Sequence, residues 1–271
     1  MNLHPNITAY QGVESLSRFN ESSFLDYCRA KLKICDKHID FIRSNCMNGK
    51  AAIDVLEIGS GSGKLLFRLE QEGLLNYGVG YELSASRVAF SEKFAEFCKS
   101  KRVESINADF LDASIKRHSF DLIIGIDVVY NLIGGTDQTF EDVCLAKAAS
   151  LLVPGGCLVL EIMTCSRELS FIANSEDRHY RPWKMFDETN PFQFGLDDMS
   201  IDHSGNLVWS KKFIDRKGEV SEFTNVLRPY AEKDIQSLLL KHGFHSTIFQ
   251  NWALDDDTSD QKFIVLARKE N

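Results

Sequence analysis

Apolar and polar positions recur along the chain with two different periods. Short apolar runs have the length of buried strands, and the segments between them carry apolar residues at every third or fourth position, which is typical of amphipathic helices. The pattern predicts helices over 24–46, 63–72, 84–100, 139–152 and 231–242, and strands over 52–58, 77–81, 103–106, 121–126, 157–162, 244–250 and 263–268. A capping box of Thr139 and Asp142 is expected to start one helix, and Pro154-Gly155-Gly156 is expected to form a turn.

Five apolar strands that alternate with helices predict a parallel sheet covered on both faces. Right-handed crossovers then bring the carboxyl ends of these strands to one edge, where such sheets bind their ligands. From about Ser166 the periodicity weakens, and residues 200–228 favour β-hairpins with turns at 203–206 and 216–219. The acidic run 255–260 is expected to be a solvated turn between the last two strands.

The composition narrows the function classes. The 31 Lys+Arg and 39 Asp+Glu give a net charge of −8, and no basic cluster dominates, so a general nucleic-acid binder is disfavoured. The most apolar stretch, 122–135, is interrupted by Asp127 and Asn131, so no membrane span is expected. The first residues lack the features of a secretory signal, and the seven cysteines include no C-x-x-C pair. We therefore expect a cytoplasmic protein with reduced, buried thiols and no metal site.

The strongest chemical signal is a strand that ends in closely spaced glycines and leads directly into a helix, Glu57-Ile58-Gly59-Ser60-Gly61-Ser62-Gly63-Lys64. Such a loop lets a nucleotide approach the backbone closely. The nucleoside-triphosphate pattern G-x-x-x-x-G-K-[ST] fails, because Ile58 and Leu65 stand at two of its required positions. The match to the dinucleotide pattern G-x-G-x-x-G is incomplete, because Lys64 stands in place of its third glycine, which weakens that interpretation.

The stretch resembles instead the first motif of class I S-adenosylmethionine (SAM)-dependent methyltransferases of the small-molecule type, E/D-x-G-x-G-x-G after a strand. Further blocks resemble later motifs of this family in the same order, at 80–84, 107–111, 120–127 and 151–160. The resemblance covers about residues 52–165 together with the closing helix and strands. It implies an α/β fold: a Rossmann-like, doubly wound, mostly parallel seven-stranded sheet with an N-terminal helical segment and a β-rich lid insertion.

The resemblance also divides the chain. Residues 1–50 are expected to form an N-terminal helical cap, 51–165 the SAM-binding core, 166–229 a substrate lid, and 230–271 the helix and strands that complete the core.

The expected cofactor is SAM, which leaves as S-adenosylhomocysteine. Glu82 lies 23 residues after Gly59, where a carboxylate can accept both ribose hydroxyls. The resemblance implies that the block around Asp109 borders the adenine and that this acid receives its exocyclic amine. The residues expected to bind the cofactor are Glu57, Gly59, Ser60, Gly61, Gly63, Glu82, Leu83, Asp109, Phe110 and Asp127.

The implied chemistry is a direct displacement, in which the protein aligns donor and acceptor, excludes water and supplies a base where one is needed. The catalytic candidates are Asp127 at the end of the fourth strand, Tyr130 shortly after it, and His179 in the lid. Nucleic-acid amino-methyltransferases usually carry [DNS]-P-P-[YFW] at this place. The sequence Asp127-Val128-Val129-Tyr130 lacks both prolines and disfavours that acceptor.

Acceptor choice is assigned to the two variable regions. Tyr10, Phe19 and Tyr27 precede the sheet, in a segment that often closes over the methionine part of SAM in this family. The lid carries Arg178, His179, Tyr180, Arg181, Trp183 and Lys184, which suit an anionic or aromatic acceptor, although a solvated amphipathic face explains them equally well. Trp209 and Phe213 suggest, as an alternative, a homodimer interface.

We predict methyl transfer to an oxygen or nitrogen atom of a small molecule, with neither nucleic acid nor membrane as partner. The alternatives are a protein or RNA methyltransferase, a non-catalytic SAM-binding subunit and, more remotely, an NAD(P)-dependent oxidoreductase.

Overall fold

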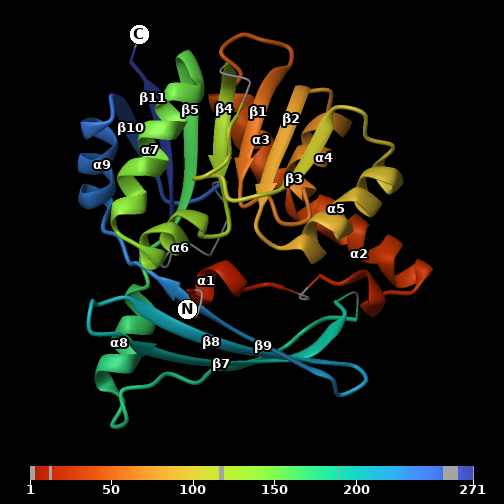
Figure 1. Cartoon of the computed structure of the whole chain (residues 1–271), viewed down its shortest axis with the longest axis vertical. Helices are drawn as coiled ribbons and strands as arrows, with labels where there is room; N and C mark the ends of the chain where they lie inside the picture. Colours follow the sequence, from red (N-terminus) through yellow and green to blue (C-terminus); the bar gives the residue numbers. More distant parts are fainter. Residues whose placement is uncertain (1–3, 12–13, 116–118, 189, 253–261, 271) are drawn as a thin grey trace.

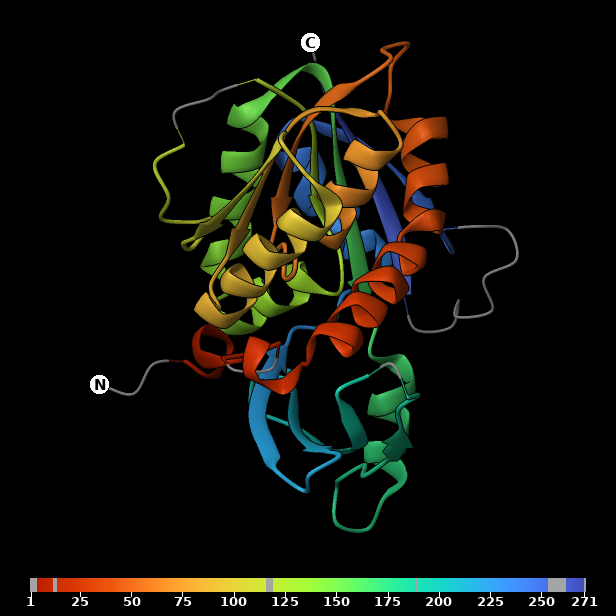
Figure 2. The same ribbon diagram turned by 90° about the vertical axis from the view of Figure 1, so that its right-hand side faces the viewer.

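Two sheets of unequal size build the protein. A computed structural model describes residues 4–11, 14–115, 119–188, 190–252 and 262–270. The larger sheet has helices on both faces, and the smaller one lies beyond the edge where strands β1 (Ile53–Ile58) and β2 (Leu75–Glu82) end (Figure 1, Figure 2). The N-terminal segment runs between them.

The larger sheet has seven strands, as predicted. Their spatial order is β10 (Phe244–Phe249), β11 (Lys262–Lys269), β5 (Leu152–Met163), β4 (Phe120–Gly125), β1, β2 and β3 (Val103–Asn107). The neighbours from β5 to β3 pair in parallel, and β11 pairs antiparallel with both β5 and β10. The sheet is therefore mostly parallel. The chain continues from β1 toward β2 and from β4 toward β5, in opposite directions across the sheet. Sheets of this kind bind their ligands at such a switch point, beside the carboxyl ends of the two strands.

The helices cover both faces because the strands are apolar on both sides. Adjacent residues of β1 show this: Val55 packs in the core cluster on one face and Leu56 in that on the other. On one face lie α6 (Val129–Thr136), α7 (Thr139–Leu151) and α9 (Glu232–Lys241); on the other lie α3 (Asp36–Asn45), α4 (Lys64–Gln71) and α5 (Ala85–Cys98), with α2 (Glu21–Ile34) packed beside α4.

The smaller sheet is an antiparallel meander, which confirms the predicted hairpins. It follows α8 (Ser166–Asn174) and contains β6 (Trp183–Met185), β7 (Phe192–Ile201), β8 (Leu207–Asp215) and β9 (Val220–Leu227). Asp202 and Asp215 precede the two predicted turns, and each carboxylate accepts backbone N–H groups within its turn. Helix α8, strand β6 and the part of β7 that precedes Ser200 were not predicted.

The N-terminal segment ties the two sheets together. It contains α1 (Pro5–Thr8) and a short 3₁₀ helix, η1 (Leu16–Arg18). The Asn6 amide donates to the carbonyl oxygens of Leu132 at 2.8 Å and Val226 at 2.7 Å, and its oxygen accepts from the Val226 N–H at 2.7 Å. One side chain thus joins α6 of the core to β9 of the smaller sheet.

One predicted helix is two helices. The periodicity over 24–46 continues through Cys35, but the chain ends α2 there and starts α3. The two helices serve different parts of the core: Phe24, Tyr27 and Cys28 pack with the aromatic residues of α5, whereas Ile39 and Ile42 pack against the main sheet. A break between them lets each apolar stripe meet its own cluster.

Helix α6 was not predicted, because its sequence VYNLIGGT contains β-branched residues and two glycines. Tertiary contacts hold it. Asn131 donates to the carbonyls of Met163 and Arg228 and accepts from the Met163 N–H, and a Cβ on Gly135 would stand 2.1 Å from a carbonyl of β9. The close approach of β9 explains the glycine.

Three further predictions are corrected or fall outside the described residues. The capping box of Thr139 and Asp142 was wrong, because Asp137 accepts both the N–H and the hydroxyl of Thr139 instead. The turn at 154–156 is an irregularity inside β5, where the pairing register with β4 shifts. The acidic run 255–260 lies outside the described residues.

All seven cysteines are free thiols, and all except Cys98 are buried. Among the described helices, none combines the length and the apolar character needed to cross a membrane.

Candidate functional site

The glycine loop leaves β1 and enters α4 at the centre of the main sheet. Gly59 and Gly61 both have positive φ, of 63° and 56°. A Cβ on Gly59 would come within 2.5 Å of Val129 on α6, so this glycine is required by a close contact as well as by its backbone conformation. Gly63 starts α4 and does not line the cavity described below.

Glu82 at the end of β2 holds this loop in place. One carboxylate oxygen accepts the Gly61 N–H and the other accepts the Ser84 N–H, both at 2.8 Å. The guanidinium of Arg87 lies 3.8 Å away, and only 6% of Glu82 is exposed. Glu82, the residue predicted to bind the ribose, is therefore joined to the predicted glycine loop by a hydrogen bond.

The segment after β3 forms the next wall. Asp109 accepts the Leu111 N–H at 2.8 Å, which stabilises its own turn, and it lines the cavity. Phe110 is buried beside it, and the Lys147 ammonium lies 5.1 Å from the centre of its ring. Leu83 lines the cavity from the end of β2. These residues and the glycine loop stand at one edge, as predicted.

Glu57 is a buried acid with an unused oxygen. Only 1% of it is exposed, and its Oε2 atom has no hydrogen-bond partner among the described residues. Burial raises the pKa of this carboxyl to about 8, so it is mostly protonated at pH 7. A cationic ligand in the cavity would supply a partner for this oxygen.

Asp127 lies in the turn after β4 with a positive φ of 55°, and its N–H donates to Glu161 at 2.7 Å. Its carboxylate lies 2.7 Å from the Lys64 ammonium, which holds the pKa of Asp127 well below its usual range. Asp127 lines the cavity, as expected of a cofactor-binding residue. An acid so strongly ionised accepts a proton weakly, which does not suit a general base.

The other two catalytic candidates do not line this cavity. Tyr130 is fully buried in the core, its ring centre 5.4 Å from that of Tyr230, because α6 turns that side chain toward α7 and α9. His179 lies 2.6 Å from Asp198, one residue along β7 from the inward-facing Asp197. A shift of one residue along a strand changes the face, so this histidine belongs to the outer side.

The N-terminal segment contributes residues that sequence reasoning missed. Glu14 is buried, accepts from the Tyr27 hydroxyl at 2.8 Å, and forms ion pairs with Lys31 at 3.1 Å and Arg87 at 2.9 Å. Arg87 also lies 4.5 Å from the centre of the Tyr10 ring. Tyr10 and Tyr27 line the cavity, whereas Phe19, which was also expected there, packs in the aromatic cluster of α2 and α5.

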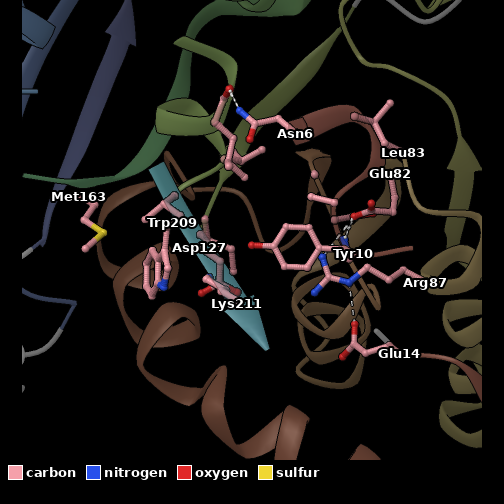
Figure 3. Close-up of a pocket in the computed structure, with 18 of the residues that line it drawn as sticks. Asn6, Tyr10, Glu14, Glu82, Leu83, Arg87, Asp127, Met163, Trp209 and Lys211 are labelled. Carbon is pink, nitrogen blue, oxygen red and sulfur yellow. Dashed lines mark hydrogen bonds and ion pairs between the residues drawn. The ribbon is translucent and has the colours of Figure 1, made fainter. Parts of the chain in front are cut away.

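A single cavity of about 940 Å³ joins the edge of the main sheet to the smaller sheet. Its far wall is the inner face of β7 and β8, where Asp197, Trp209, Lys211 and Phe213 line it. In Figure 3, the hydroxyl end of Tyr10 points toward Asp127 and Lys211. Trp209 and Phe213, which the sequence suggested as residues of a homodimer interface, thus face the cavity.

Of the lid residues singled out from the sequence, Tyr180 and Lys184 line the cavity. The others, Arg178, His179, Arg181 and Trp183, do not. Arg181 forms exposed ion pairs with Asp177 and Asp198, as a solvated face does.

Comparison with known proteins places the chain among methyltransferase folds. A family model described as a methyltransferase domain matches residues 50–213. No curated protein sequence matches the chain.

Solved structures resemble most of the chain. An S-adenosylmethionine-dependent methyltransferase from Clostridium acetobutylicum has 18% identity and a TM-score of 0.70, over 88% of this chain and 97% of that one. The CcbJ methyltransferase from Streptomyces caelestis has 16% identity and a TM-score of 0.68, over 87% and 89%. The glycopeptide N-methyltransferase MtfA, solved with S-adenosylhomocysteine, has 16% identity and a TM-score of 0.55, over 87% and 90%. At these identities the likeness establishes the fold.

Proposed function

The chain belongs to the methyltransferase-domain family of class I, Rossmann-like SAM-dependent methyltransferases, and from this premise we propose that it methylates an oxygen or nitrogen atom of a small molecule. SAM is its cofactor, and when bound it supplies an electrophilic methyl group on a sulfonium. What the protein adds is a place for donor and acceptor together, in a defined orientation and away from water.

The residues at the edge of the main sheet fit the donor. The glycine loop offers a backbone that a nucleoside can approach closely, and the Glu82 carboxylate stands beside it to accept the ribose hydroxyls. Glu57 contributes the unpartnered buried oxygen described above, which suits a positively charged ligand. Asp109, Phe110 and Leu83 would flank the adenine.

The continuity of the cavity is the observation that carries the proposal. The donor edge and the inner face of the smaller sheet line the same space of about 940 Å³, within the range of small-molecule sites. A methyl group bound at the first wall would therefore face an acceptor held at the second.

The walls also favour a small acceptor over a macromolecule. The N-terminal segment closes one side through Asn6 and Tyr10, and the meander of β7, β8 and β9 closes another. Aromatic side chains such as Tyr180, Trp209 and Phe213 line the acceptor half and suit an apolar or flat ligand. The name of one structural relative, a glycopeptide N-methyltransferase, supports nitrogen as the atom methylated.

The test is an acceptor screen with SAM labelled in its methyl group. The purified protein is offered a panel of small amines, phenols and alcohols, and separately cell protein and RNA. We expect label to pass to small molecules. Label that passes only to protein or RNA would refute the proposal. Tight binding of S-adenosylhomocysteine with no transfer to any of the three pools would indicate a binding subunit.

A further inference from the structure

Lys211 occupies an unusual place in the acceptor half. It lies on β8 between Trp209 and Phe213 and faces the cavity with them. Its Nζ is 3.6 Å from the centre of the Trp209 ring and 5.8 Å from that of Phe223. Within the described chain, its ammonium group forms neither a hydrogen bond nor an ion pair, and it lies against these aromatic rings.

The other lysines that line the cavity differ from Lys211 in this respect. In the described structure, Lys31 pairs with Glu14 at 3.1 Å, Lys64 with Asp127 at 2.7 Å and Lys262 with Glu161 at 3.1 Å, and Lys184 lies 3.9 Å from Asp197. Each of these ammonium groups lies beside a carboxylate. Among the residues that the structure describes, no carboxylate lies at such a distance from Lys211, so its nitrogen is available to a ligand.

The charges around Lys211 come from several elements. Asp197 is its cross-strand neighbour on β7 and favours its charged form, whereas burial opposes it. Three cations also oppose it: Lys184 of β6, Arg87 of α5 and Lys262 of β11. Arg167 and Glu168 of α8, with Tyr10 and Asp127, line the same cavity.

Burial and the three cations together lower the pKa of Lys211 to about 7. At pH 7 roughly half of such a lysine is neutral, against roughly one molecule in 2,500 at the ordinary pKa of about 10.4.

On the basis of the proposed function, we propose that Lys211 is the general base of the transfer and that the acceptor is a primary or secondary amine. The neutral Nζ of Lys211 takes a proton from the ammonium form of the acceptor, which frees the lone pair of the acceptor nitrogen. That lone pair forms the new N–CH₃ bond as the C–S bond of the sulfonium breaks, with its electron pair left on sulfur. The methylated product leaves as an ammonium ion, and Lys211 returns its proton to solvent.

The chemistry of the cavity favours an amine over an alcohol. A base of this strength can deprotonate an ammonium group a few pKa units above it, but not an alcohol hydroxyl, which is a far weaker acid. The aromatic side chains of Trp209, Phe213 and Tyr180 would contact the cationic form before it loses its proton. The buried oxygen of Asp197 that has no described partner adds to this attraction.

The titration of Lys211 can be measured without any acceptor. Trace labelling of the intact protein with acetic anhydride, read peptide by peptide by mass spectrometry, follows each lysine from pH 5 to 11. Lys212 is the matched reference, because it lies next in β8 on the opposite, exposed face and pairs with Glu222 at 3.3 Å. We expect a labelling midpoint near 7 for Lys211, clearly separated from the labelling curve of the reference residue. A midpoint above 9 for Lys211, or no labelling, would overturn the base assignment.

The catalytic role is measured with K211M, K211R and K212M on the best amine from the acceptor panel. In the wild type, kcat/KM should rise through pH 7 and then level off. We expect K211M and K211R to lose about a hundredfold or more in kcat at pH 7. Their activity should instead rise with pH toward the pKa of the acceptor itself. K212M should match the wild type, and all three should bind S-adenosylhomocysteine normally.

Three outcomes separate the two proposals. K211M with kcat within threefold of the wild type at pH 7, or a panel in which only hydroxyl compounds are methylated, would overturn the present inference and leave the proposed function standing. A panel in which no small molecule is methylated would instead defeat the proposed function. The labelling midpoint still decides whether Lys211 is a neutral amine at pH 7.

Discussion

Substituting Glu82 by glutamine should weaken donor binding through a defined change in hydrogen bonding. The carboxylate now accepts two backbone N–H groups, those of Gly61 and Ser84, each at 2.8 Å. Glutamine has the same shape, but one of its two polar atoms is an NH₂ group. That group would meet a backbone N–H, donor against donor, so E82Q keeps one of the two bonds and loses the other.

The expected magnitude follows from this count. A hydrogen bond to a charged group contributes about 1.5–3 kcal/mol, and the N–H left without a partner is buried with Glu82. If the loop must be reordered when the donor binds, this cost appears in the affinity. We therefore expect the Kd for S-adenosylhomocysteine to rise by roughly 10- to 150-fold. The ribose would also lose its charged acceptor, which places the effect toward the upper end.

Isothermal titration calorimetry with S-adenosylhomocysteine measures this change, and urea unfolding of the ligand-free protein shows whether the variant folds. Glu104→Gln is the matched control, because Glu104 is an exposed acid on β3 that accepts from the Tyr77 hydroxyl at 2.9 Å. A folded E82Q protein that binds within twofold of the wild type would refute the reasoning, since the carboxylate would then serve neither the loop nor the ligand.

Three shorter predictions concern the same cavity. G59A should bind S-adenosylhomocysteine at least tenfold more weakly in calorimetry, because its methyl group would lie 2.5 Å from Val129. G73A is the control, since Gly73 also has a positive φ but an added methyl group there would meet nothing within 4 Å, and its affinity should be unchanged. Binding of cationic SAM should release close to one proton at pH 6–7 and none above pH 9, because the pKa of Glu57 is raised to about 8 and a nearby cation lowers it. Calorimetry in phosphate and in Tris measures this release, since the two buffers take up a proton with different heats. Equal binding heats in the two buffers, or a release that persists in E57Q, would contradict the prediction. N6A should destabilise the fold by about 1–3 kcal/mol in urea unfolding, since three backbone groups each lose their hydrogen bond to Asn6. An unchanged midpoint would mean that this link carries no energy.

The sequence was sufficient for the donor half because local patterns encode it. Apolar runs of strand length set the main sheet, and a parallel sheet brings the ends of β1, β2 and β3 to one edge without further information. The glycines at 59 and 61 occur because their backbone lies in the left-handed region. Glu82 could be placed by its distance from them along the chain. Each inference used residues within about one βαβ unit.

The missed residues depend on partners far away in the chain. Asn6 bonds to Val226, 220 positions later, and Glu14 pairs with Arg87 across 73. Neither has a local pattern that separates it from an ordinary surface residue. Lys211 did have a signal, because Trp209, Lys211 and Phe213 alternate with polar neighbours and must share one face of a strand. The sequence could not show that this face lines a cavity.

The two halves of the cavity therefore follow different physical rules. The donor half is built from backbone groups and strand ends, so changes there disturb the fold itself, as the contact between Gly59 and Val129 illustrates. The acceptor half consists of side chains at alternate positions of an antiparallel meander, whose register the turns fix whatever those side chains are. Substitutions such as that of Lys211 can therefore alter the chemistry without altering the frame. The N-terminal segment touches both halves, through the bonds of Tyr10 to Ser84 on one side and to Asn225 on the other, so acceptor and donor binding should be coupled through it.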